Sequence, residues 1–299
     1  MTGSFQRLIE SMDPVPPATL SRRELDSHKG NFGRLLFIGG SRGMAGSIAM
    51  SAMAALRSGA GLVTVATPSA CLDTVAGYHP AYMTIPLKDD KEGRLAPLPA
   101  NFFAELSSQY DVIGCGPGLS DSEGAQEAVR QMISLSEPLR VLDADALNVL
   151  ARMPGDLKSY LDTAGAIVLT PHPKEMERLT GVSSGDRRGQ IRVAELLSQS
   201  TQAVWVLKGA PTVVIADGLL WTNDTGNPGM ATGGSGDVLT GIITALIGQG
   251  MSPWDAARVG VWVHGRTGDL AAQRHGYASL ISTDLINYLS RVMRELENF

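Results

Sequence analysis

A glycine-rich loop at residues 226–237 ends in one acidic side chain, Asp237. Glycine lets backbone N–H groups approach a ligand closely. Residues 238–247 are apolar at helical spacing, which predicts a helix that begins where the loop ends. A helix N-terminus presents unpaired N–H groups and the positive end of the helix dipole. The segment therefore predicts an anion site, most often one for phosphate.

The carboxylate of Asp237 has two interpretations beside such a site. It caps the helix, or it is a general base that takes a proton from a hydroxyl while the loop holds a transferring phosphoryl group. The loop does not match the Walker pattern G-x-x-x-x-G-K-[ST], and it lies near the C-terminal end of the chain. The residues alone leave both interpretations open.

Several other segments read as buried strands that end in glycine or in polar side chains. Ligands of open α/β sheets bind beyond the C-terminal ends of the strands, so we expect the three glycine loops, those of residues 34–47 and 111–119 and the loop at residues 226–237, to meet along one edge. A strand, a glycine loop, a helix and a second strand in that order also predict a parallel sheet. The segments are residues 34–47, 111–119, 139–148, 166–176 and 203–215.

The polar residues at these strand ends have alternative interpretations. Asp143 and Asp145 alternate with alanine and point the same way on an extended chain, where they could hold hydrated magnesium or a substrate hydroxyl; otherwise Asp145 caps a helix. His172 stands between two prolines, either as a ligand contact or as a structural histidine. Lys208 either neutralises a phosphate or is solvated.

Residues 226–237, G-N-P-G-M-A-T-G-G-S-G-D, closely resemble the signature of the NAD(P)H-hydrate dehydratases, which belong to the ribokinase-like superfamily. The resemblance extends from about residue 27 to the C-terminus. It implies an α/β fold with a mostly parallel sheet and helices on both faces. The supporting segments are S-H-K-G-N-F-G-R, G-G-S-R-G-M-A-G-S, G-P-G-L, D-A-D-A-L-N, T-P-H-P-K-E and K-G-A-P-T.

The resemblance also implies roles for single residues, with Asp237 as the catalytic base. It implies that Glu175 acts on a magnesium ion through a bound water. Substrate would contact Gly46, Ser47, Gly116, Gly118, His172 and Asp237; the nucleotide would contact Lys208, Gly209, Ala210, Pro211, Thr212 and Gly236; the anion hole would consist of Gly233, Gly234, Ser235 and Gly236.

The implied activity is the repair of hydrated NADH and NADPH, (6S)-NADHX and (6S)-NADPHX, with ADP or ATP as phosphoryl donor. ADP would give AMP and phosphate, and bacterial relatives tend to use ADP. Relatives form tetramers. Many carry a fused epimerase domain for which this chain has no room, so we expect a separate epimerase. The alternatives are a sugar or thiazole kinase of the same superfamily and a nucleotide-sensing module without turnover, against which an intact Asp237 argues.

Composition argues against several other classes of function. A net charge of −5 and a pI near 5.6 argue against nucleic acid or an anionic membrane as the main partner. No apolar run is long enough to span a bilayer, and the first residues lack the core of a secretory signal. The two cysteines, Cys71 and Cys115, favour buried thiols and a cytoplasmic location.

The chain divides into a polar arm, residues 1–26, with room for one short helix, and one domain, residues 27–299. We expect the arm to pack on the body or on a neighbouring subunit. Near the C-terminus, residues 256–274 predict a helix in which we interpret His264 as a packing histidine. Ser282 is the expected start of a final amphipathic helix that reaches residue 299.

Overall fold

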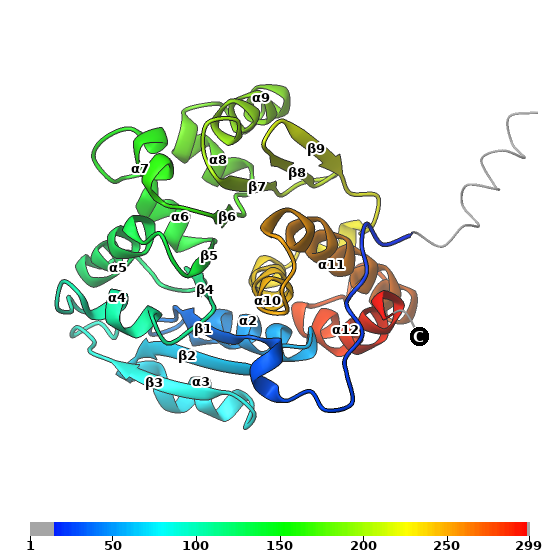
Figure 1. Ribbon diagram of the computed structural model, residues 1–299, viewed down its shortest axis with the longest axis horizontal. Coiled ribbons are helices and arrows are strands. Elements are labelled where there is room, and N and C mark those ends of the chain that lie inside the picture. Colours follow the sequence, from blue (N-terminus) through cyan, green and yellow to red (C-terminus); the bar gives the residue numbers. More distant parts are fainter. Residues whose placement is uncertain (1–14, 298–299) are drawn as a thin grey trace, which may run out of the picture.

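The computed structural model describes residues 15–297 (Figure 1). Within them, nine strands form one sheet in the order β3-β2-β1-β4-β5-β6-β7-β8-β9. The strands from β3 to β7 are parallel, and β8 and β9 extend one edge antiparallel. The strands are β1 Arg34–Ile38, β2 Leu62–Pro68, β3 Met83–Leu87, β4 Val112–Cys115, β5 Leu139–Leu142, β6 Ile167–Leu169, β7 Ala203–Leu207, β8 Val213–Ala216 and β9 Leu219–Thr222.

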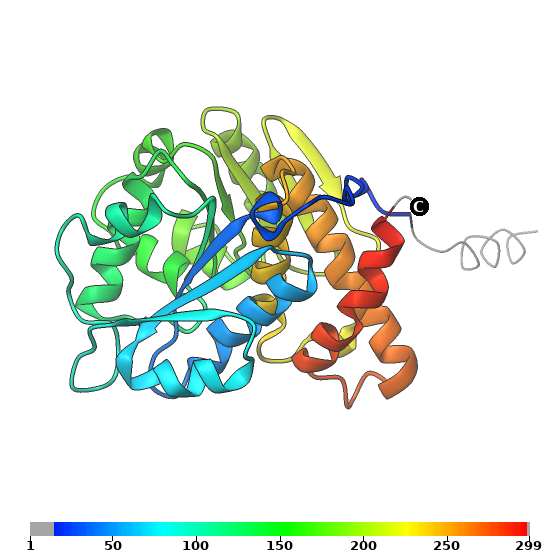
Figure 2. The ribbon, with the colours of Figure 1, turned by 60° about the horizontal axis from the view of Figure 1, so that its bottom comes forward.

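Helices cover both faces of the sheet, which confirms the predicted fold class (Figures 1 and 2). One face carries α2 Ala45–Arg57, α3 Leu72–Tyr78, α10 Ser235–Gly248, α11 Pro253–His275 and α12 Ser282–Leu296. The other carries α4 Phe102–Ser107, α5 Glu123–Ser134, α6 Asp145–Leu150, α7 Leu157–Thr163, α8 Pro173–Thr180 and α9 Arg187–Ser198. Three 3-10 turns complete the described elements: η1 Lys29–Phe32, η2 Ser69–Cys71 and η3 Pro228–Met230.

The central strands are buried along their length because helices cover both of their faces. Every residue of β4, β6 and β7 is buried, as is all of β1 after its first residue. Such strands read as continuous apolar runs rather than as alternating patterns. This is the physical reason that the sequence marks them clearly.

Residues 15–26 contain no helix and lie along the body of the protein. Leu20 bridges to Glu297 beside the end of α12. The guanidinium of Arg23 lies 3.7 Å from the ring centroid of Phe32, and it donates a hydrogen bond to the carbonyl of Gly59. The short helix expected in the arm is absent from residues 15–26, and residues 1–14 lie outside the described part of the chain. The last helix ends at Leu296, and Glu297 is extended, so the prediction that this helix reaches residue 299 is wrong.

Neither cysteine forms a disulfide within the described residues, and both thiols are buried. None of the described helices is long and apolar enough to cross a membrane.

Helix α10 packs closely against α2, and glycine permits that approach. A Cβ placed on Gly241 would lie 2.1 Å from the backbone oxygen of Ser51. The contact brings the N-terminus of α10 to the edge at which β1, β4, β5, β6 and β7 end (Figure 1). The sheet and α2 together therefore fix the place of the glycine-rich loop.

We expect Gly241→Ala to destabilise the protein, because the added methyl has no space between α10 and α2. The cost should be about 1–3 kcal/mol of unfolding free energy, measured by denaturant unfolding. Gly77→Ala is the matched control, since nothing lies within 4 Å of a Cβ placed there in α3. That variant should be neutral or more stable by about 0.5–1 kcal/mol. Equal stability of the two variants would contradict the close approach.

Candidate active site

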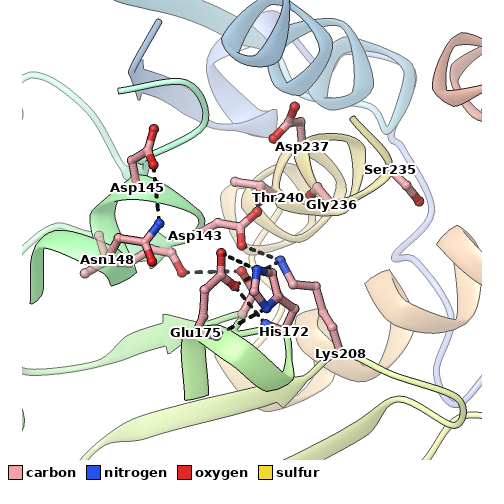
Figure 3. A network of polar contacts seen from close by, with 12 residues as sticks. Asp143, Asp145, Asn148, His172, Glu175, Lys208, Ser235, Gly236, Asp237 and Thr240 are labelled. Atoms are coloured by element: carbon pink, nitrogen blue, oxygen red, sulfur yellow. Dashed lines mark hydrogen bonds and ion pairs between the residues drawn. The ribbon is translucent and has the colours of Figure 1, made fainter. Parts of the chain in front are cut away.

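Asp237 lies in the first turn of α10, where the predicted helix begins. A hydrogen bond joins its carboxyl group to the side chain of Ser47 in the first turn of α2. Its backbone oxygen accepts a hydrogen bond from the hydroxyl of Ser51, at 2.8 Å. Figure 3 shows the carboxyl group of Asp237 turned toward α2. Helix α2 therefore orients both the carboxyl group and the backbone carbonyl of Asp237.

Lys208 and Asp143 form the centre of the polar network (Figure 3). Lys208 Nζ lies 2.7 Å from Asp143 Oδ1, and Thr240 donates to Asp143 Oδ2 at 2.8 Å. The carboxylate is 1% exposed and the lysine side chain 19% exposed. A Cβ on Gly236 would lie 3.2 Å from Lys208 Nζ, so the first turn of α10 presents bare backbone next to an ammonium group.

Glu175 and His172 cap α8 reciprocally. Glu175 Oε2 accepts the backbone N–H of His172 at 2.8 Å, and His172 Nδ1 accepts the N–H groups of Lys174 and Glu175. Because Nδ1 is an acceptor, Nε2 carries the proton, and it lies 3.2 Å from Glu175 Oε1. Lys208 Nζ is 3.8 Å from Glu175, so the cap joins the central network. His172, 43% exposed, thus has a structural role that leaves part of its side chain open to solvent.

The segment that follows β7, residues 208–212, is held by a residue that the sequence analysis did not single out. Arg187, at the start of α9, donates to the backbone oxygens of Leu207, Lys208 and Pro211 at 2.8, 3.3 and 3.1 Å. Arg187 therefore fixes the path of the chain through the predicted nucleotide-binding residues.

The remaining predicted substrate residues lie on two loops that touch. A Cβ on Gly118 would lie 3.1 Å from Cβ of Ser47, and one on Gly116 would lie 1.9 Å from the backbone oxygen of Asp143. Gly46 precedes Ser47 in α2. The loop after β4 thus sits between Asp143 and the start of α2, and the strand ends meet as expected.

Asp145 does not point the same way as Asp143, so the interpretation of a pair on an extended chain is wrong, although the charges of both raise the pKa of Asp237. Between them Ala144 has φ of 51°, so the chain turns there instead of staying extended. Asp145 begins α6, where its carboxylate accepts the N–H of Ser120 at 2.8 Å and a hydrogen bond from Asn148. Figure 3 shows Asp145 pointing away from Lys208.

Burial and neighbouring charges shift the titration of these groups. Burial raises the pKa of Asp237 to about 6, the charge of Asp143 adds to this, and the hydrogen bond from Ser47 acts against it. Burial raises the pKa of Glu175 to about 7, although Lys208 opposes it. Burial also disfavours the charge of Lys208, but Asp143 and Glu175 outweigh that effect and raise its pKa. A cation that stays charged thus lies near two carboxyl groups that titrate near neutral pH.

Burial lowers the pKa of His172, and the charge of Lys208 adds to this effect. The imidazole is therefore neutral near pH 7, and its exposed edge offers hydrogen bonding without charge.

Comparison with known proteins gives one family for most of the chain. The family described as NAD(P)H-hydrate dehydratase matches residues 35–291. A bifunctional NAD(P)H-hydrate repair enzyme Nnr of Moorella thermoacetica is 42% identical over 280 residues, 93% of this chain and 52% of that protein. The chain thus spans about half the length of the curated relatives that it matches.

Solved structures give the same result. An ADP/ATP-dependent NAD(P)H-hydrate dehydratase of Bacillus subtilis, co-crystallised with ATP and Mg²⁺, is 30% identical with a TM-score of 0.77, covering 93% of this chain and 95% of that one. A hydroxyethylthiazole kinase of Pyrococcus horikoshii is 16% identical with a TM-score of 0.56, covering 87% of this chain and 91% of that one. The second likeness is one of fold alone.

We expect Lys208→Met to destabilise the protein strongly, because it leaves Asp143 buried without its cation. Breaking a buried pair from one side costs about 3–5 kcal/mol. The double variant Lys208→Met/Asp143→Asn should lose less than Lys208→Met alone, since residue 143 then carries no unpaired charge. Denaturant unfolding of the wild type, both single variants and the double variant gives the coupling energy; additive losses would contradict the pair as described.

Proposed function

The chain belongs to the NAD(P)H-hydrate dehydratase family, and from this premise we propose that it restores NADH and NADPH from their hydrates at the expense of a nucleoside di- or triphosphate. The observation that carries the proposal is the position of Asp237. A partly buried carboxylate stands at a bare helix N-terminus within reach of one buried ammonium group. That combination suits removal of a proton from a hydroxyl beside a bound phosphate.

In the proposed reaction, Asp237 takes the proton of the substrate hydroxyl, and the hydroxyl oxygen attacks the terminal phosphorus of the nucleotide. The bond from that phosphorus to the bridging oxygen breaks, so ADP leaves as AMP and ATP leaves as ADP. The phosphorylated hydrate then expels phosphate as the ring nitrogen supplies its electron pair, and loss of a ring proton restores the dihydronicotinamide. The balance is hydrate plus ADP to NAD(P)H, AMP and phosphate.

The chain's own residues stabilise the charge that develops on the phosphoryl group. The backbone of Gly233, Gly234, Ser235 and Gly236 forms the anion hole in this proposal. Lys208 supplies a positive charge beside Gly236. Residues 208–212, with the path that Arg187 imposes on them, line the nucleotide.

Magnesium fits this site in the manner of phosphate-bound ions. The described residues hold no cluster of three or more His, Cys, Asp or Glu side chains able to hold a metal ion, so a cage made only of protein is excluded there. Mg²⁺ is usually bound through one or two carboxylates, waters and substrate phosphates. Glu175 is the oxygen donor that would hold it through a water, and the ion would neutralise phosphate charge.

Substrate contacts belong to the same proposal. Gly46 and Ser47 lie in the first turn of α2, Gly116 and Gly118 in the loop after β4, and His172 just before α8. Glycine at 116 and 118 lets that loop pack directly against the backbone oxygens of Asp143 and Met44. His172 would offer its exposed, neutral edge to a polar group of the substrate.

A small-molecule kinase that makes a stable product is the alternative. Its first step would be the same, and the base and anion hole do not separate the two activities. Membership of the dehydratase family favours the hydrate as substrate. A sugar or thiazole substrate is favoured only by the fold that the chain shares with a thiazole kinase.

Several finer properties of the protein remain predictions. They are the preference between ADP and ATP, action on one epimer beside a separate epimerase, a homotetramer, a cytoplasmic location, and action of residues 27–299 as one domain.

The first test is recovery of absorbance at the NADH band from hydrated NADH with Mg²⁺, in parallel with ADP, with ATP and without nucleotide. We expect recovery with at least one nucleotide and a stoichiometric release of phosphate. No recovery in protein that binds nucleotide by calorimetry would overturn the dehydratase. A stable phosphorylated product from another hydroxyl compound would support the kinase.

Asp237→Asn should bind nucleotide as the wild type does and lose about 10²- to 10⁴-fold in kcat, the usual contribution of a general base. In the wild type, kcat/KM should fall as the pH drops through about 6, because protonated Asp237 cannot accept a proton. Glu175 titrates close by, so Glu175→Gln is the control and should keep the acid limb. An acid limb that vanishes in Glu175→Gln would assign it to Glu175 instead.

A further inference from the structure

Two peptide carbonyl groups of the anion hole are held by side chains from other helices. The hydroxyl of Ser282, in α12, donates to the backbone oxygen of Gly233. Nε2 of His264, in α11, lies 2.9 Å from the backbone oxygen of Ser235. The peptides that follow Gly233 and Ser235 therefore each have a fixed acceptor side.

A planar trans peptide points its C=O and its N–H in opposite directions. Fixing the oxygen of Gly233 therefore fixes the N–H of Gly234, and fixing the oxygen of Ser235 fixes the N–H of Gly236. Within residues 15–297, neither of these N–H groups donates to a backbone acceptor outside its helix or to a side chain. Both N–H groups are therefore available to a phosphate at this helix N-terminus, provided that they point toward it.

Glycine makes such fixing necessary. Gly234 has φ of 88°, and residues without Cβ exchange peptide orientations at little cost. A reversed peptide would present an oxygen to the phosphate in place of an N–H. The backbone freedom of glycine, which lets the loop approach the ligand, therefore also allows a peptide to turn a carbonyl oxygen toward the phosphate.

We propose that His264 and Ser282 are positioning residues for phosphoryl transfer, which hold the N–H groups of Gly236 and Gly234 toward the transferring phosphate. The inference rests on the proposed function. Neither side chain has to touch the ligand, since each acts through a carbonyl on the opposite side of the peptide.

The chemistry of His264 suits this role. A carbonyl oxygen cannot donate, so Nε2 must carry the proton in the contact with Ser235. Burial lowers the pKa of His264 to about 4, which keeps the ring neutral with its proton on that nitrogen. Ser235 Oγ lies 3.1 Å from the same nitrogen, and Figure 3 shows the side chain of Ser235 turned away from Lys208. Ser235 thus contributes backbone to the hole, and its hydroxyl belongs to the His264 contact.

Helix α11 also holds the earlier part of the loop. Asp269 accepts the N–H of Gly226 at 2.9 Å and a hydrogen bond from Asn227 at 3.0 Å. The N-P-G segment is thereby tied to the helix that carries His264. The histidine interpreted as a packing residue is therefore part of a polar frame around the whole glycine-rich loop.

The test compares His264→Gln, which can place an amide N–H near the position of Nε2, with His264→Leu, which cannot donate. Thr267→Val is the matched control, since Thr267 is buried on the same helix and its hydroxyl has no partner within the described residues. We expect His264→Leu to lose about tenfold or more in kcat with little change in the KM for hydrated NADH, because a misdirected donor acts on the transition state. His264→Gln should recover most of that loss, and Thr267→Val should match the wild type.

Ser282→Ala provides a second, smaller change if His264→Leu does not fold. It removes one oxygen and should lower kcat with the same signature, while Ser279→Ala, an exposed serine nearby, should not. Equal activity of His264→Leu and wild type, or equal loss in His264→Leu and His264→Gln at the same melting temperature, would overturn the proposal.

A readout without turnover separates this proposal from the proposed function. In ¹⁵N NMR spectra, ADP should shift the amide signals of Gly234 and Gly236 in the wild type and in His264→Gln, and shift that of Gly236 much less in His264→Leu. This pattern in a protein that does not repair hydrated NADH would refute the dehydratase and keep the positioning role. Equal shifts in all three proteins would refute the positioning role.

Discussion

The site depends on one ammonium group enclosed among carboxylates. Lys208 lies 2.7 Å from Asp143 and 3.8 Å from Glu175, and the charge of Asp237 also acts on it. A buried charge is tolerated only when it is paired and hydrogen-bonded. The four residues come from the ends of β5 and β7 and from the first turns of α8 and α10, so the pairing forces these elements together. The charge pairing of Lys208 thus determines both the electrostatics of the site and the arrangement of these elements at the edge of the sheet.

That constraint explains why the helix N-terminus carries no side chain at Gly236. A Cβ there would stand 3.2 Å from the ammonium and 3.6 Å from Asp143. The space at Gly236 is therefore open to an anion that binds at the helix N-terminus. A bound phosphate would add negative charge beside three carboxyl groups. Lys208 and the helix dipole offset that charge, and the raised pKa values of Asp237 and Glu175 reduce the repulsion near neutral pH.

The sequence predicts well those features that depend on residues close together in the chain. A buried strand followed by glycine has its signal within a few residues. The rule that ligands bind beyond parallel strands then gathers the ends correctly. Asp145 was misplaced because a single residue with positive φ, Ala144, turns the chain between the two acids. No alternation of residue types marks that turn.

Contacts between distant segments lie outside such reasoning. Asp143 and Thr240 are 97 positions apart, and Gly233 and Ser282 are 49 apart. No pattern in either segment announces its partner. Arg187 was likewise overlooked, since a guanidinium that binds three backbone oxygens looks in sequence like any solvated arginine. Several elements of the fold, among them β3, α3 and α4, were not predicted. Their apolar runs are short, and no glycine loop of the kind used to recognise other strands follows them.

The proposed base, anion hole and lysine account for the proposed first chemical step, a step that would be common to kinases and dehydratases. The fate of the phosphorylated product is decided by the substrate, because a phosphate next to a ring nitrogen can be expelled by the nitrogen's electron pair and one on a sugar carbon cannot. Specificity for a hydrate must therefore come from the part of the site that faces away from the nucleotide. There the loop after β4 packs between Asp143 and Ser47, and Ser47 hydrogen bonds to the proposed base. The residues proposed to select the substrate and the residue proposed to activate it are thus in direct contact, so a change in the loop after β4 would also alter the environment and the pKa of Asp237.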